Sequence, residues 1–183
     1  MVISILYGVA FLFALLIAVG YILFFKNREK PFILLFSFIA VTNLGYLLVS
    51  ISVTLKSALI ANTLSYFGSV FLPMIMLLIL LDSLEKKVSK SVSVVLTILA
   101  ICVFLITTTQ LFPGLGLYYK NATLLFTEDG SAYLSKDYGS LHTLYPIYLG
   151  GYFLTMICFS LSAVFKKKMK SGKEISIPLT FQK

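Results

Sequence analysis

The chain has 183 residues, of which 59% are hydrophobic and only 12% are charged, and its formal net charge is +8. Ordinary soluble domains carry about 25% charged residues, so the composition argues against a soluble globular domain and indicates an integral membrane protein. The positive charge does not indicate a nucleic-acid partner, because the basic residues lie between apolar runs, where anionic lipid head groups are found.

Five apolar stretches free of charged residues are each long enough to cross a bilayer. An α-helix rises 1.5 Å per residue, so a hydrocarbon core of about 30 Å takes about 20 residues. The sequence therefore predicts an all-α integral membrane protein built as a five-helix transmembrane bundle, with helices at about 2–25, 31–55, 57–81, 91–112 and 141–165.

The first apolar run has no Lys or Arg before it and is followed by "KNREK", Lys26 to Lys30. A secretory signal has the opposite arrangement, with basic residues first and a cleavage site after, so we expect this helix to be retained with Met1 outside. In that topology the basic residues divide twelve to three. The three on the Met1 side are Lys56, Lys120 and Lys136. The bias places the carboxyl end in the cytoplasm.

Two asparagines interrupt the second and third apolar runs, which are joined by a tight turn near Lys56. Asn43 and Asn62 are costly in a membrane unless their amides find partners. They line a ligand or signalling cavity, or they form hydrogen bonds that hold neighbouring helices together. Both interpretations stay open at this stage.

Small residues recur every fourth position on the third helix, at Ala61, Ser65 and Ser69. This spacing predicts a close helix-packing face, either within the chain or between two copies in a homodimer. Pro73 continues the same face. We expect Pro73 and Pro146 to kink or loosen their helices, as hinges or simply as packing geometry.

A long polar stretch separates the fourth and fifth helices. "PGLG", Pro113 to Gly116, is expected to end the fourth helix. Two β-prone runs then flank "EDG", which predicts an extracellular β-hairpin at about 117–137 with its turn at Asp129 and Gly130. The stretch is a connector or a lid over the helix ends.

The single histidine, His142, follows this hairpin beside Tyr138 and Tyr145. It is a candidate for sensing pH or binding a ligand at the outer mouth of the bundle. The alternative is an aromatic belt at head-group depth.

Catalytic signatures are missing from the chain. There is no HExxH, GxSxG, phosphate-binding Gly loop or CxxC, so we expect no enzyme activity, no metal and no cofactor. Cys102 and Cys158 fall in different apolar runs and are expected to pack as small apolar residues rather than to form a disulfide.

Three segments resemble a known family. "SYFGSVFLPMIMLLILLD", Ser65 to Asp82, is similar to the third helix of the amino-terminal seven-transmembrane sensor region of bacterial histidine kinases and diguanylate cyclases. "FSFIAVTNLGYLLVSIS", Phe36 to Ser52, resembles that family's second helix, and "DYGSLHTLYPIYLGGYF", Asp137 to Phe153, resembles the start of its fifth.

The resemblance implies a sensor-like domain over 1–171 in the bacterial cytoplasmic membrane, with 172–183 as a cytoplasmic tail or the start of a missing sixth helix. It implies an unknown small-molecule or membrane stimulus and a cytoplasmic kinase or cyclase effector that this chain lacks. The candidate ligand-binding or signalling residues are Asn43, Tyr46, Asn62, Tyr66, Pro73, Tyr138 and His142. Two other classes stay open: a small transporter, which needs a polar path across the bilayer, and an assembly subunit.

Overall fold

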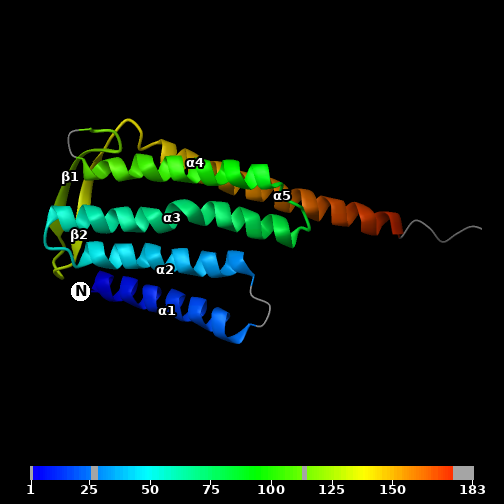
Figure 1. Cartoon of the computed structure of the whole chain (residues 1–183), viewed down its shortest axis with the longest axis horizontal. Coiled ribbons are helices and arrows are strands. Elements are labelled where there is room, and N and C mark those ends of the chain that lie inside the picture. The colour runs from blue at the N-terminus through cyan, green and yellow to red at the C-terminus, as the bar shows by residue number, and fades with distance from the viewer. Residues whose placement is uncertain (1, 26–28, 113–114, 175–183) are drawn as a thin grey trace, which may run out of the picture.

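The computed structural model describes residues 2–25, 29–112 and 115–174, with side chains described up to Lys166. Five long α-helices run side by side, and a two-stranded antiparallel hairpin covers one end of them (Figure 1). The elements in chain order are α1 (Val2–Phe24), α2 (Lys30–Ser50), α3 (Leu55–Ser83), α4 (Lys90–Thr108), the 3₁₀ turn η1 (Thr109–Leu111), β1 (Tyr119–Phe126), β2 (Ala132–Tyr138) and α5 (Leu144–Glu174).

All five helices are long and apolar enough to cross a membrane. The predicted five-helix bundle with a hairpin between the fourth and fifth helices is therefore confirmed. We call the end that carries the hairpin the hairpin end, and the opposite end the loop end. The amino terminus lies at the hairpin end, and α5 extends beyond the other helices at the loop end (Figure 1).

The turn between α2 and α3 is short, and Thr54 at its end caps the start of α3. The hydroxyl of Thr54 accepts a hydrogen bond from the Ser57 amide at 3.2 Å, and the Ser57 hydroxyl accepts one from the Thr54 amide at 3.4 Å. This reciprocal capping box satisfies two amide groups that a helix start leaves without partners. The two helices consequently run antiparallel and pack along their length.

Glycines bring the backbones of α2 and α3 into contact. A Cβ atom added at Gly45 would lie 2.6 Å from the Ser65 Cα, and one at Gly68 would lie 2.6 Å from the Phe38 carbonyl oxygen. No real Cβ atom fits at such distances. The small-residue face of α3, where Ala61 and Ser65 are buried, thus packs against α2 within the chain.

The centre of the bundle lies on α3, which supplies more buried side chains than any other element. On one side, Val70, Leu77 and Leu81 pack with residues of α4 and α5 in the main hydrophobic cluster. On the other side lies α2, with α1 beyond it (Figure 1). Most other large apolar side chains are exposed, as expected where lipid rather than protein is the neighbour.

Two expectations about helix ends are adjusted by the structure. Pro146 is the third residue of α5, which begins at Leu144, so its missing amide removes no helical hydrogen bond and the expected kink at this residue is wrong. The fourth helix changes to a 3₁₀ turn at Thr109, ahead of the "PGLG" motif. Pro113, Gly114 and residues 175–183 lie outside the described residues.

Adding one methyl group should have opposite effects at two glycines. We expect Gly45→Ala to destabilise the protein by about 1–3 kcal/mol, because α2 and α3 must move apart. The matched control is Gly150→Ala, where a Cβ atom meets nothing within 4 Å. That change should stabilise α5 by about 0.5–1 kcal/mol. Thermal unfolding of both variants in lipid nanodiscs measures the two effects; an unchanged midpoint for Gly45→Ala would contradict the close approach.

A candidate functional site beneath the hairpin

The hairpin is closed by a tight turn that only glycine suits well. Gly130 has φ of +78° and donates a hydrogen bond to the Thr127 carbonyl at 2.9 Å, while the Thr127 amide donates to the Ser131 carbonyl at 2.9 Å. Positive φ is the conformation that the Asp-Gly sequence predicts. The turn lies where the sequence indicated, between β1 and β2.

The tip of the hairpin rests on the first turn of α1. The amide of Val2 donates to a carboxylate oxygen of Asp129 at 2.9 Å, and the hydroxyls of Ser4 and Ser131 lie 3.3 Å apart. A carboxylate at a helix amino terminus satisfies unpaired amides and interacts favourably with the helix dipole. The hairpin therefore reaches from α4 and α5 across the bundle to α1.

The base of the hairpin is fixed by a second close approach. The amide of Gly139 donates to the Tyr118 carbonyl at 2.9 Å, and the amide of Leu141 donates to the Leu117 carbonyl at the same distance. A Cβ atom at Gly139 would lie 2.5 Å from the Gly116 carbonyl oxygen, so this position requires glycine. The chain leaving β2 is thereby held against the chain entering β1 and directed into α5.

Beneath the hairpin, the buried amide of Asn62 joins four elements. Its Nδ2 donates to Gln110 Oε1 of η1 at 2.6 Å and lies 3.4 Å from the Tyr119 hydroxyl of β1. Its Oδ1 accepts from Lys136 Nζ of β2 at 3.2 Å. Gln110 in turn donates to the Thr63 hydroxyl at 3.0 Å. Asn62 and Gln110 are 2% and 4% exposed, so these bonds replace water that cannot reach them.

An aromatic cluster continues from this amide toward α5. The hydroxyls of Tyr66 and Tyr119 lie 3.0 Å apart. The Tyr118 ring contacts those of Tyr66 and His142, with centroid distances of 5.4 Å and 5.2 Å, and His142 stacks on Tyr138 at 3.8 Å. The fully buried Tyr118 hydroxyl has no hydrogen-bond partner among the described residues.

Two tyrosines of α5 attach that helix to α3. The hydroxyl of Tyr145 donates to the Ser69 hydroxyl at 3.1 Å, and the hydroxyl of Tyr148 donates to the Val70 carbonyl at 2.8 Å. Pro73 lies one turn further along α3 and lacks the amide that would bind the Ser69 carbonyl. The ring of Tyr145 also packs edge-on against Tyr66, with centroids 5.3 Å apart. The cluster under the hairpin is therefore continuous with the α3 and α5 contact.

Burial controls the charge state of the cluster. Lys136 is largely withdrawn from water, which lowers its pKa to about 8, and the partners described above for its ammonium are neutral: the Asn62 amide and the Tyr119 ring, 5.1 Å away. Burial also lowers the pKa of His142, with a further contribution from the Lys136 charge. Burial raises the pKa of the Tyr118 and Tyr119 hydroxyls, which favours their neutral forms.

Of the residues singled out from the sequence, four meet in this cluster: Asn62, Tyr66, Tyr138 and His142. Asn43 and Pro73 lie elsewhere, and Tyr46 lies beside the cluster, near Ser65 and Tyr145. Asn43 donates to the Ile39 carbonyl of its own helix at 2.9 Å, and Tyr46 stacks on Tyr7 of α1 with ring centroids 5.3 Å apart. Pro73 is buried in α3 beside the attachment of α5.

The sequence reasoning missed Gln110, Tyr118, Tyr119 and Lys136, which complete the cluster. Gln110 carried a usable signal, because it is the one amide in the fourth apolar run. Lys136 was counted only as a surface charge. Its burial depends on how β2 is placed over α3, which no local pattern in the sequence specifies.

Five helices able to span a membrane, a hairpin over one end of them and a polar cluster beneath that hairpin describe a membrane-embedded helical domain. No group of three metal-ligating side chains occurs in the part of the chain that the structure describes. A scan against known families matches residues 8–179 to the family described as the N-terminal 7TM region of histidine kinase. The match covers most of the chain, which therefore belongs to this family, the membrane sensory input region of histidine kinases.

The family description counts seven transmembrane segments, of which five lie within the described residues. No curated protein and no solved structure matches the chain. The suspected family resemblance is confirmed.

The partly buried ammonium of Lys136 should make stability depend on pH with a defined sign. The unfolded chain keeps this proton up to the ordinary pKa of 10.5, whereas the folded protein releases it above about 8. The unfolded state binds more protons within this window, so folding stability should rise with pH there.

We expect Lys136→Met to remove this rise between pH 8 and 10 from thermal unfolding curves recorded in nanodiscs. The control is Lys120→Met, on the exposed face of β1, which should keep the rise. If the unfolding midpoint changes with pH to the same extent in the native protein and in Lys136→Met over this range, Lys136 is not withdrawn from water as described.

Proposed function

We propose that the chain is the input module of a bacterial receptor in the cytoplasmic membrane, with the hairpin end outside and the loop end in the cytoplasm. A stimulus at the hairpin end changes how the hairpin is seated on the Asn62 cluster. The change passes through α3 and α5 to a cytoplasmic kinase or cyclase. The observation that carries the proposal is the continuous buried network from Lys136 through Asn62 and Tyr66 to α5.

The charge distribution supports the proposed orientation. Among the residues that the structure describes, the basic ones at the hairpin end are Lys56, Lys120 and Lys136, and Glu128, Asp129 and Asp137 offset their charge. The remaining twelve Lys and Arg residues of the sequence fall on the opposite side in the five-helix topology, and those described with side chains at the loop end are Lys30, Lys86, Lys87, Lys90 and Lys166. Short loops that are rich in Lys and Arg stay on the cytoplasmic side of the membrane, so the loop end is assigned to the cytoplasm.

The placement of polar groups supports an input at one end rather than a path across the bilayer. All buried polar side chains of the described residues lie in the hairpin half of the bundle: Ser50, Ser52, Asn62, Ser65, Thr107, Gln110 and Ser131. A carrier would need such groups along its whole depth. The loop half of the described core is apolar.

The helix α5 suits the role of output element. It has 31 residues and is therefore about 46 Å long, which exceeds the thickness of the hydrocarbon core. Its start follows the hairpin directly, and its far end projects beyond the bundle (Figure 1). A stimulus that favours one seating of the hairpin shifts the population between two positions of this helix.

The orientation is testable with single cysteines on a background of Cys102→Ser and Cys158→Ser. We expect Glu128→Cys, on the exposed hairpin turn, to react with a membrane-impermeant maleimide in intact cells. Lys87→Cys, on the exposed linker between α3 and α4, should react only after lysis. The reverse pattern would overturn the proposed topology.

The coupling is testable on this chain without its effector. Spin labels at Ser83→Cys and Lys166→Cys, both exposed at the loop end, report the distance between α3 and α5. We expect Asn62→Leu, made far away at the hairpin end, to shift or broaden this distance distribution in nanodiscs, because Gln110 and Lys136 lose their partner.

The matched control is Asn43→Leu, which removes only a hydrogen bond within α2. It should leave the distribution unchanged. If the spin-label distance distributions are identical in the native protein and in Asn62→Leu, the cluster does not influence the position of α5, and the proposed transmission route is wrong.

A further inference from the structure

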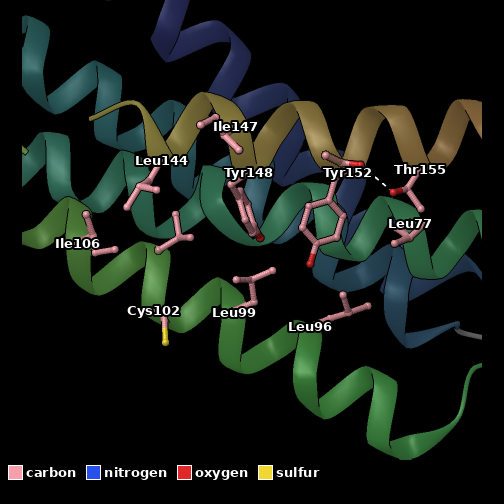
Figure 2. Close-up of a pocket in the computed structure, with 12 residues that line it drawn as sticks. Leu77, Leu96, Leu99, Cys102, Ile106, Leu144, Ile147, Tyr148, Tyr152 and Thr155 are labelled. Atoms are coloured by element: carbon pink, nitrogen blue, oxygen red, sulfur yellow. Dashed lines mark hydrogen bonds between the residues drawn. The ribbon is translucent and has the colours of Figure 1, made fainter. Parts of the chain in front are cut away.

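A groove lies between α4 and α5 in the membrane-spanning region, and Asn62, Gln110, Tyr119 and Lys136 are not among the residues that line it. The helices α4 and α5 splay apart and leave a groove of about 550 Å³, a volume typical of small-molecule sites (Figure 2). Its walls are almost entirely apolar and come from both helices, with Leu77 of α3 behind them. The groove faces the lipid, so a molecule dissolved in the bilayer reaches it directly.

One polar group lies in this apolar groove. Tyr152 is only 5% exposed, and its buried hydroxyl has no hydrogen-bond partner among the described residues. Figure 2 shows the hydroxyl pointing toward α4, between Leu96 and Leu99. The neighbouring Tyr148 hydroxyl donates its proton to the Val70 carbonyl at 2.8 Å. A buried hydroxyl without a partner is unfavourable and rare in native proteins.

The wall beside Tyr152 is left open by a glycine. Gly151 lines the groove, and a Cβ atom added there would meet no atom of the protein within 4 Å. The Thr155 hydroxyl, one turn further on, is satisfied by the Gly151 carbonyl at 2.7 Å. The groove therefore offers apolar walls and a single free O–H donor.

We propose that this groove binds a lipid-soluble molecule that presents one carbonyl oxygen to Tyr152 while its apolar body fills the space between α4 and α5. The depth of Tyr152 selects among carbonyl compounds. It lies eight residues after the start of α5, about 12 Å into a core of about 30 Å. Ester carbonyls of phospholipids lie at the interface, so the ligand is a long-chain ketone or quinone that carries its carbonyl in the hydrocarbon interior.

The inference deepens the proposed function by naming a class of membrane stimulus, yet its test measures only binding. The native chain is placed in nanodiscs of saturated phosphatidylcholine, and its unfolding midpoint is recorded with 7-tridecanone or with tridecane, which lacks only the carbonyl. Binding to the folded state raises the midpoint. We expect the ketone to raise it clearly more than the alkane does.

Two variants locate the binding. Tyr152→Phe keeps the ring and removes the donor, so the ketone should bind about tenfold more weakly, and its effect should fall to that of the alkane. Gly151→Leu fills the groove and should abolish both effects. The control Gly150→Leu alters the adjacent residue, which is not part of the groove, and should preserve them.

Other outcomes overturn the inference. If the ketone raises the unfolding midpoint equally in the native protein and in Tyr152→Phe, the Tyr152 hydroxyl does not recognise the carbonyl. If neither probe acts and Gly151→Leu lowers stability, a protein helix rather than a small molecule covers the groove. Either result leaves the Asn62 cluster and the spin-label distances untouched, so failure here is distinguishable from failure of the proposed function.

Discussion

A side-chain amide inside an apolar bundle must satisfy two donors and an acceptor without water, and Asn62 does so by binding groups from three other elements. Gln110 of η1, Tyr119 of β1 and Lys136 of β2 converge on it. None of these partners is adjacent to Asn62 in the sequence. The hairpin end is therefore arranged around the hydrogen-bonding capacity of a single residue, and the seating of the hairpin, the end of α4 and the burial of Lys136 depend on it.

The same amide links two regions with different requirements. Above it, the strands of the hairpin are largely exposed. Below it, α3 continues through Tyr66 to Pro73, where Tyr145 and Tyr148 attach α5. Side chains that are packed or hydrogen-bonded at every step thus connect the hairpin to α5, which is a contiguous route for the proposed coupling.

The sequence predicts the helices well because the bilayer imposes a single strong requirement, which is a charge-free run of sufficient length. It also predicts the hairpin turn, since Asp129 and Gly130 have a local conformational preference. It predicts the polar cluster only partly. Asn62 stands out in an apolar run, but so does Asn43, which merely bonds to Ile39 of its own helix. Which asparagine gathers partners depends on the side of the helix that the hairpin covers, and this is a tertiary property.

Lys136 and Pro146 also show that the residue type alone does not predict the effect of a residue in the fold. A lysine in a short polar segment is ordinarily solvated, and only the fold reveals that this one is partly buried and hydrogen-bonded to Asn62. A proline in an apolar run ordinarily distorts a helix, and only the true start of α5 reveals that Pro146 lies where no amide is required. In both cases the residue type is informative, but its effect depends on a boundary a few residues away.

The backbone contact at Gly45 and Gly68 has a mechanical consequence. Helices that touch through their main chains have no side chains between them to rearrange, so they cannot slide past one another without breaking the contact. The pair α2 and α3 therefore forms a fixed frame embedded in the membrane. The helices α4 and α5 are held to that frame by side chains and have a groove between them, so in the proposed mechanism they are the part of the molecule that moves.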